Sequence, residues 1–334
     1  MKCFITGVAG FLASHVADRL LVSGHEVVGV DSLIGGELSN VPSGVEFHVA
    51  DCGDLSDMVR LSSGCDAMVH AACTPYEGLS VFSPHLITQN TFQITSTLLS
   101  AAVQNGIEKF LYCSSMARYG TQETLPFTED MECKPQDPYG IAKVASEMLI
   151  ANMCKVHGLQ YVICVPHNII GPRQKYDDPF RNVASIMINR MLQGDQPIIY
   201  GDGSQKRCFS FVQDTISCFE QALLRDDVNG KVFNVGPDEE FISINTLAEE
   251  IAEILDFNLG PQYVPARPQE VNLAHCSSEL IREWFGYETK TTLREGLKSL
   301  VTYIREKGPK PFNYHLPIEI KSDLTPKTWK EKLI

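Results

Sequence analysis

Short apolar segments alternate with longer helical patterns through the first half of the chain, and this alternation is the strongest constraint on its fold. The apolar segments are expected strands at residues 4–5, 27–30, 45–49, 67–70, 110–113 and 161–165. The helical patterns between them fall at residues 11–22, 86–104 and 139–156. Strands separated by helices form a parallel sheet that is covered on both faces. The sequence therefore predicts a doubly wound α/β domain over residues 1–170.

The rhythm of elements becomes looser after Gly171 and Pro172, where prolines punctuate shorter segments. Helical patterns recur at residues 183–192, 215–224, 246–255 and 293–304. We expect residues 171–307 to form a smaller cap, with some later segments woven back into the first domain. From Gly308 the chain carries further prolines and many lysines, which predicts an extended tail over residues 308–334.

Composition limits the partners and the compartment. The 28 Lys+Arg against 41 Asp+Glu give a net charge of −13, which argues against a nucleic acid or an anionic membrane surface as main partner. No apolar run approaches the ~20 residues that a membrane span needs, and no secretion signal pattern opens the chain. The 11 cysteines show no CxxC pair and no zinc spacing. We expect reduced thiols, no metal site and a cytoplasmic protein.

A glycine-rich turn joins the first strand to the first helix. Gly7 permits the tight turn, and Gly10 lets a pyrophosphate approach the backbone beside the free amides of the helix start. Asp31 ends the second strand, where its carboxylate can accept ribose hydroxyls and repel a 2′-phosphate. The alternative is an ordinary strand–helix–strand unit with a solvated Asp31. We favour a Rossmann-type site that holds NAD rather than NADP.

Weaker signals follow the third and fourth strands. Asp51 and Cys52 come after the third strand, where an adenine edge lies within reach. Ala71 and Ala72 follow the fourth strand, where small side chains leave room for a cofactor. Ligands of parallel sheets bind at the carboxyl ends of the strands, so we assign all four residues to the cofactor site. Simple packing is the alternative for each of them.

A tyrosine and a lysine lie four residues apart at the start of the helical pattern 139–156. On a helix, Tyr139 and Lys143 share one face, and Pro138 suits the first helical position. A lysine ammonium and a cationic nicotinamide both favour phenolate, so we expect a lowered pKa for Tyr139 and a role as base toward a sugar hydroxyl. Ser115, after the fifth strand, is placed to hydrogen-bond the reacting oxygen. The alternatives are a surface tyrosine packed on a lysine stem and a turn-forming serine.

These residues belong to an ordered set of motifs. The motifs are TGVAGFLA at 6–13, SSMARYG at 114–120, YGIAK at 139–143, NIIGPRQ at 168–174, GDGSQKR at 201–207 and the pair Arg267-Pro268. Over about residues 1–305 the chain resembles the extended short-chain dehydrogenases/reductases, in the nucleotide-sugar epimerase and dehydratase group. The resemblance implies NAD as cofactor and a nucleotide-diphosphate sugar, with a UDP-sugar the first choice, as substrate in the cap.

The positions after Ser115 separate the reactions within this group. The 4,6-dehydratases carry an Asp-Glu pair there, and decarboxylating members carry a Glu that this chain lacks. Here Met116 and Ala117 occupy the two positions, and neither can transfer a proton. The remaining set of Ser115, Tyr139 and Lys143 resembles that of the UDP-hexose 4-epimerases. The implied reaction removes a hydride and a proton at C4, turns the 4-keto sugar over and returns both, so that NAD stays bound.

The resemblance completes two sets of expected site residues. The cofactor set is Gly7, Gly10, Phe11, Leu12, Asp31, Asp51, Cys52, Ala71, Ala72, Asn90, Ser114, Tyr139, Lys143 and His167. The substrate set is Ser115, Tyr139, Asn168, Asn182, Tyr200, Arg207, Phe209, Arg267, Glu270 and Ala274. Arg207 and Arg267 are expected to clamp the diphosphate. Ala274 is expected to leave room for an N-acetyl group at C2 of the sugar. The alternatives are surface residues on cap loops, and a packing or hydrogen-bonding role for His167.

Two other functions stay open at this point. The first is an epimerase or C4 dehydrogenase of another nucleotide sugar, such as UDP-glucuronate or a GDP- or CDP-sugar, which shares every catalytic residue. The second is a non-catalytic NAD-binding sensor. The presence of Ser115, Tyr139 and Lys143 together argues against a sensor, because sensors on this fold typically lose the tyrosine or the lysine.

The resemblance also implies a homodimer, in which the segments 86–104 and 139–156 pair across a two-fold axis. The apolar residues expected to form this surface are Ile94, Leu98, Leu99, Met148 and Met153. The alternative is that these side chains only cover the sheet.

Overall fold

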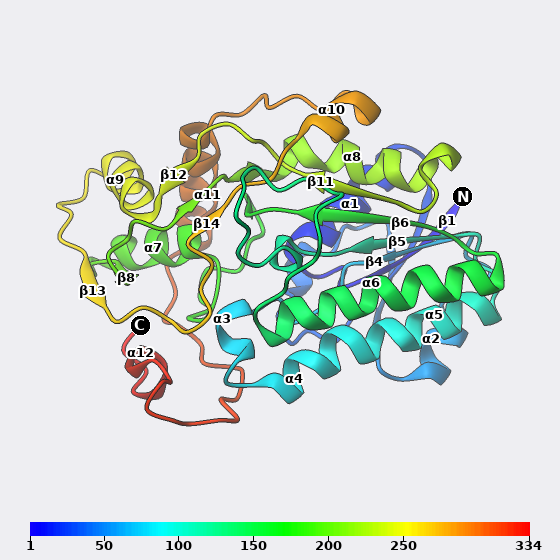
Figure 1. The fold of residues 1–334 in the computed structure, drawn as a ribbon, viewed down its shortest axis with the longest axis horizontal. Coiled ribbons are helices and arrows are strands. Elements are labelled where there is room, and N and C mark those ends of the chain that lie inside the picture. Colours follow the sequence, from blue (N-terminus) through cyan, green and yellow to red (C-terminus); the bar gives the residue numbers. More distant parts are fainter.

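The protein, described over residues 1–334 by a computed structural model, is built on a seven-stranded parallel sheet (Figure 1). The strands run in the order β11-β6-β5-β4-β1-β2-β3. Their bounds are β1 (Lys2–Thr6), β2 (Glu26–Asp31), β3 (Val45–Val49), β4 (Ala67–His70), β5 (Lys109–Cys113), β6 (Gln160–Pro166) and β11 (Lys231–Val235). The order reverses at β1, which is the doubly wound Rossmann-type arrangement. The predicted fold class is confirmed.

Helices cover both faces of this sheet (Figure 1). One face carries α1 (Phe11–Val22), α8 (Val212–Leu224) and α10 (Glu279–Phe285), and the other carries α2 (Leu55–Leu61), α5 (Ile94–Gln104) and α6 (Pro138–His157). Neighbouring side chains of β1 pack in different apolar cores: Cys3 and Ile5 lie in the core on the first face, and Phe4 lies in the core on the second. Burial on both faces explains why the strands are continuous apolar runs in the sequence.

One predicted helix is interrupted. The pattern 86–104 corresponds to α4 (Pro84–Thr88), a π-helical turn over Gln89–Gln93, and then α5. The short helix α3 (Glu77–Ser80) precedes them. A π-turn inserts one residue into the helical ladder and often marks a functional position. Asn90, expected at the cofactor, lies in this turn.

The cap is a smaller layer of helices and short strands beside the carboxyl ends of the main sheet. Its helices are α7 (Val183–Leu192), α9 (Ile244–Leu255) and α11 (Leu293–Lys307). Its strand pairs and triplet are β7 (Ile169–Ile170) with β10 (Ser210–Phe211), β8 (Ile198–Tyr200) with β13 (Gln262–Val264), and β9 (Lys206–Arg207) between β12 (Ile242–Ser243) and β14 (Leu273–Ala274). The three helices share one apolar core. Between cap segments, α8 and β11 return to the main sheet.

The last segment, residues 308–334, is called the tail below. It runs from α11 to the region of α3 and α4 and ends in the short helix α12 (Lys327–Lys330), drawn in red in Figure 1. It has little regular structure, but it is packed: Trp329 is only 2% exposed and lies in an apolar cluster with residues of α3 and of the cap. The expectation of an extended tail therefore omits its contacts with the body of the protein.

The structure also bears on the expectations about membrane spans, cysteines, metal sites and a dimer surface. None of the helices is long and apolar enough to cross a membrane. All 11 cysteines are free, and no group of side chains suited to hold a metal ion is found. Ile94, Leu98 and Leu99 are buried in the sheet-covering core, so these three cannot form a dimer surface, whereas Met148 is 70% exposed. A homodimer stays a prediction.

Candidate active site

A cavity of about 510 Å³ opens between the carboxyl ends of the strands and the cap, which is the place where open α/β sheets bind ligands. All of the expected cofactor residues except His167, and all of the expected substrate residues except Ala274, line it. The two sets come from segments as distant as Gly7 and Glu270, so the fold brings them together. Their individual binding roles stay predictions.

The turn between β1 and α1 has no room for side chains. Gly7 has φ +73°, and a Cβ added there would lie 2.9 Å from Cα of Ala72. A Cβ on Gly10 would lie 2.9 Å from the carbonyl oxygen of Gly7. The backbone of this turn therefore lines the cavity directly, with the α1 amides behind it. This is the cradle that a pyrophosphate requires.

Asp31 closes the same end of the cavity. One carboxylate oxygen accepts the backbone N–H of Ala9 at 3.0 Å, and the other accepts that of Leu33 at 2.7 Å. Burial raises the pKa of Asp31, while these two hydrogen bonds oppose the rise. The fixed carboxylate at the end of β2 fits the adenosine ribose of NAD, as the sequence predicts.

The start of α6 brings the expected base close to the expected serine. Asp137 caps the helix by accepting the N–H of Gly140 at 2.9 Å. A Cβ on Gly140 would lie only 2.7 Å from the carbonyl oxygen of Ala117, so the helix start packs against the short turn that follows Ser115. Ser115 caps that turn, since its hydroxyl accepts the N–H of Ala117 at 3.2 Å. Glycine at 140 thus allows Tyr139 and Ser115 to face one cavity.

Lys143 is fixed one helical turn further along α6. Its Nζ donates to the carbonyl oxygen of Cys113 at 2.6 Å and lies 5.7 Å from the centroid of the Tyr139 ring. It also lies 4.7 Å from the centroid of the Tyr112 ring. Lys143 is 1% exposed and Tyr139 is 4% exposed, so the charge acts on the phenol in a medium of low polarity.

The pKa of Tyr139 differs from the sequence-based expectation. Burial raises this pKa well above its usual range, and the positive charge of Lys143 acts in the opposite direction. The expected effect of the lysine is therefore present, but in the protein alone desolvation outweighs it. The second cation expected to lower the pKa of Tyr139 is the nicotinamide ring, which NAD supplies when it is bound.

The arginines expected at the diphosphate meet at the cap end of the cavity. Arg267 pairs with Glu270 at 2.7 Å, and its guanidinium carbon lies 4.7 Å from the centroid of the Tyr200 ring. Arg207 donates to the carbonyl oxygens of Val271 and Asn272. Glu270 thus balances Arg267 in the protein alone, and the guanidinium groups keep further N–H donors that can face an anion.

Two asparagines of the expected substrate set stand on strained backbone. Asn168 has φ +44° and donates to the carbonyl oxygen of Cys208 at 2.9 Å. Asn182 has φ +67° immediately before α7 and donates to the carbonyl oxygen of Lys175 at 3.3 Å. Non-glycine residues at positive φ are uncommon and cluster at binding sites. Both residues line the cavity.

His167 and Ala274 lie elsewhere. His167 is fully buried and its Nε2 lies 2.8 Å from the carbonyl oxygen of Pro237, against Gly236, where a Cβ would clash with the ring. Burial lowers the pKa of His167 to about 4, so it is neutral at physiological pH. Ala274 is 6% exposed within the sheet-covering core. Neither residue lines the cavity, so the geometry gives no support to a cofactor role for His167 or to a contact between Ala274 and the sugar, and both roles stay predictions.

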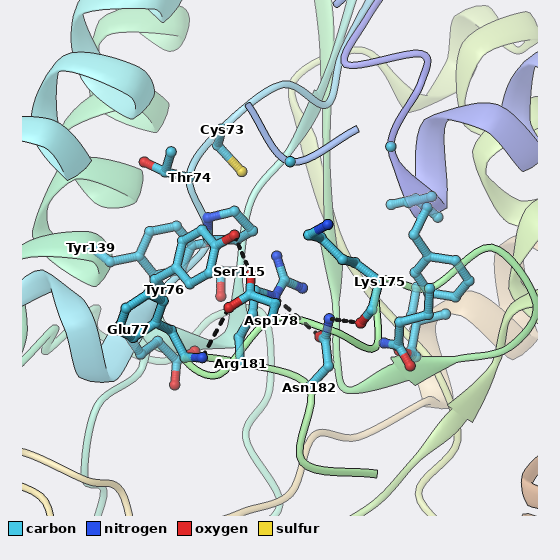
Figure 2. Close-up of a pocket in the computed structure, with 18 of the residues that line it drawn as sticks. Cys73, Thr74, Tyr76, Glu77, Ser115, Tyr139, Lys175, Asp178, Arg181 and Asn182 are labelled. Atoms are coloured by element: carbon cyan, nitrogen blue, oxygen red, sulfur yellow. Dashed lines mark hydrogen bonds between the residues drawn. The ribbon is translucent and has the colours of Figure 1, made fainter. Parts of the chain in front are cut away.

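Several lining residues escape the sequence-based prediction. After β4 these are Cys73, Thr74, Tyr76 and Glu77 (Figure 2). After β7 they are Lys175, Asp178 and Arg181, which lie beside the expected Asn182. The residues after β4 could have been predicted, because they directly follow Ala71 and Ala72 at the carboxyl end of a strand. The residues after β7 lie in an irregular segment, where no periodicity indicates which side chains face inward.

The chain is similar to proteins of known activity. Residues 3–236 match the NAD dependent epimerase/dehydratase family. A UDP-glucose 4-epimerase of Mycolicibacterium smegmatis is 32% identical over 318 residues, which cover 92% of this chain and 100% of that protein. The UDP-glucose 4-epimerase of Thermotoga maritima, solved with UDP-glucose, has a TM-score of 0.86 at 30% identity and covers 92% and 99% of the two chains. The UDP-glucuronic acid 4-epimerase of Bacillus cereus, solved with UDP-glucuronic acid and NAD, has a TM-score of 0.85 at 26% identity, covering 92% and 100%.

Proposed function

Since this chain belongs to the NAD dependent epimerase/dehydratase family, we propose that it inverts C4 of a UDP-hexose through a transient 4-keto sugar. It is an NAD-dependent enzyme of the nucleotide-sugar epimerase and dehydratase group. One observation supports C4 epimerisation within this group: Ser115, Tyr139 and Lys143 converge on the cavity, and the two residues after Ser115 are the apolar Met116 and Ala117. Elimination of water requires a proton-transferring group that these two residues do not supply.

In this proposal Tyr139 moves the proton. Its phenolate takes the proton from O4 of the sugar as C4 is oxidised, and its phenol returns the proton after the 4-keto sugar has turned over. NAD, when bound, supplies the hydride acceptor and, in the return step, the hydride donor. Ser115 orients the reacting oxygen, and Lys143 stabilises the phenolate through its charge. Because no net oxidation occurs, the protein has no need to exchange its NAD between turnovers.

A panel of nucleotide sugars tests this proposal directly. We expect UDP-glucose and UDP-galactose to interconvert to the same equilibrium mixture from either side, with no accumulation of NADH. Proton NMR of the products and absorbance at the NADH band follow both quantities. UDP-N-acetylhexosamines, UDP-glucuronate and a GDP-hexose belong in the same panel. Absence of any C4 epimer from the UDP-sugars would contradict the proposal.

A specific observation favours UDP-glucuronate as a second candidate substrate. Arg181 projects into the cavity from the segment between β7 and α7 (Figure 2), and its charge is among those that act on Tyr139. Its contacts are the side-chain oxygen of Asn182 at 3.1 Å and the Tyr76 ring. Its charge also acts on the carboxylate of Asp178, with which it forms no direct ion pair. An unpaired guanidinium near the reacting end of the cavity suits a sugar carboxylate.

Replacement of Arg181 separates the two substrates. If the uronate is the substrate, Arg181→Gln lowers kcat/KM for UDP-glucuronate by about 10- to 100-fold more than for UDP-glucose, the worth of a hydrogen bond to a charged group. The lost influence of the Arg181 charge on Tyr139 affects both sugars alike. Arg173→Gln is the matched control, since Arg173 also lines the cavity but pairs with Asp18 at 2.6 Å. Equal losses for both sugars in the Arg181 variant would argue against a carboxylate partner.

A further inference from the structure

The tail connects the two lobes that enclose the cavity. On the cap side, the N–H of Lys310 donates to the side chain of Asn189 at 3.0 Å, and that of Asn313 donates to the carbonyl oxygen of Asp177 at 2.8 Å. On the sheet side, the carboxylate of Glu319 accepts the two N–H groups at the start of α4, at 3.0 and 2.9 Å. The N–H of Ile320 donates to the carbonyl oxygen of Phe82. The first half of the tail is therefore hydrogen-bonded to both lobes and crosses between them.

Trp329 anchors the end of the tail by packing. Its ring centroid lies 5.4 Å from that of Phe180, 6.1 Å from that of Phe82 and 6.3 Å from that of Tyr200. Phe82 belongs to the sheet lobe, whereas Phe180 and Tyr200 belong to the cap and line the cavity. The indole N–H is buried without an acceptor, so the anchor depends on apolar contact rather than on a hydrogen bond. A buried indole between two lobes resists their separation.

The tail also fixes one residue of the cavity wall. The hydroxyls of Thr328 and Tyr200 lie 2.6 Å apart. Arg267 lies over the Tyr200 ring, with its guanidinium carbon 4.7 Å from the ring centroid. The Tyr314 hydroxyl accepts the N–H of Ile334, which lines the cavity itself. The end of the tail thus forms part of the wall next to Tyr200 and Arg267, where the nucleotide is expected.

We propose that the tail is the outer wall of the nucleotide site and sets how tightly the nucleoside diphosphate is held. Through Thr328 it keeps Tyr200, and with it Arg267, in the geometry that receives the nucleotide, and through Trp329 it slows the opening of the two lobes. This rests on the proposed function, in which the cavity holds a UDP-sugar.

Thr328→Val and Tyr200→Phe test the contact without removing the tail. Each change deletes one hydroxyl, and each is expected to weaken UDP binding by about two- to tenfold, as one hydrogen bond does. The double variant should bind no more weakly than either single one, because both changes remove the same interaction. Isothermal titration of the NAD-bound enzyme with UDP measures all of these affinities. Leu324→Ala, at a tail residue that is 72% exposed, is the control and should bind as the unchanged protein does.

A variant that ends at residue 312 tests the wall as a whole. It is expected to release UDP at least about tenfold faster in stopped-flow displacement, since lost interface contacts mainly raise dissociation rates, while its bound NAD per chain stays the same. Unchanged UDP affinity in both hydroxyl variants, or additive losses in the double variant, overturns the proposal, whether or not the shortened chain folds. Failure of the unchanged protein to bind UDP at all would overturn the proposed function and this inference together.

Discussion

Tyr139→Phe is expected to lower kcat by about a thousandfold or more while the protein keeps its bound NAD, because general acid–base catalysis by a positioned side chain contributes ~10²–10⁴. The change removes only the hydroxyl. The ring is 4% exposed and lies at the start of α6, where Asp137 and Gly140 fix the helix without using the phenol. The loss should therefore appear in kcat rather than in KM, since the proton transfer belongs to the transition state.

Tyr112→Phe is a matched control for this experiment. Tyr112 is also buried, its ring lies 4.7 Å from the Nζ of Lys143, and its hydroxyl has no hydrogen-bond partner, but it does not line the cavity. Loss of that hydroxyl should leave turnover nearly unchanged. Equal losses in the two variants would mean that the effect is structural. Undiminished turnover in the Tyr139 variant would contradict the catalytic proposal and revive the NAD sensor.

The regular part of the fold follows from the sequence because it depends on local signals. The helix predicted at 11–22 has the observed bounds Phe11–Val22, since the glycine turn before it and the apolar periodicity within it act over a few residues. The π-turn over Gln89–Gln93 is different. Helical periodicity continues on both sides of this turn, so no local sequence pattern reveals the inserted residue. The turn packs against α6, which is a tertiary contact.

The candidate site was predictable to the extent that it follows strand ends. Asp31 and Ser115 line the cavity because parallel strands deliver their carboxyl ends to one edge. Arg181 lies in the irregular segment before α7, and its direction is decided by tertiary contacts with Asn182 and Tyr76. For His167, the sequence motif does not predict the direction of the side chain. A motif fixes its place in the chain, but its ring turns away from the cavity into the space beside Gly236.

The tail illustrates the same limit on a larger scale. Its composition, rich in proline and lysine, is typical of a segment that does not pack on the rest of the protein. In the structure, four of its residues nevertheless contact the body of the protein. Trp329, Thr328, Glu319 and Ile320 each find a partner more than 100 residues away in sequence. Contacts of such sequence separation leave no periodic trace, so only the folded chain reveals that the tail borders the cavity.

Lys143→Met is expected to move the acid limb of the pH–rate profile to higher pH. The rate requires the phenolate of Tyr139, so it rises as pH passes through the pKa of that residue. The charge of Lys143 lowers the pKa of Tyr139 against the effect of burial, so its removal raises that pKa further. An opposite charge at this range is worth about 1 to 3 pH units. At neutral pH the variant should therefore lose about ten- to a thousandfold in kcat.

The recovery at alkaline pH distinguishes this electrostatic role from a structural one. Lys143 also donates to the carbonyl oxygen of Cys113, and methionine keeps the length of the buried side chain while it loses this bond. If the lysine acts through its charge, kcat of the variant climbs with pH beyond the point where the unchanged enzyme reaches its plateau. If it only holds β5 against α6, the variant is slower at every pH and the limb keeps its position. Measurement of kcat at saturating substrate from pH 6 to 10, with bound NAD quantified at each point, separates the two roles. The pH at which the limb lies depends on the pKa of the Tyr139 phenol, whereas the plateau value of kcat depends on the geometry of the site.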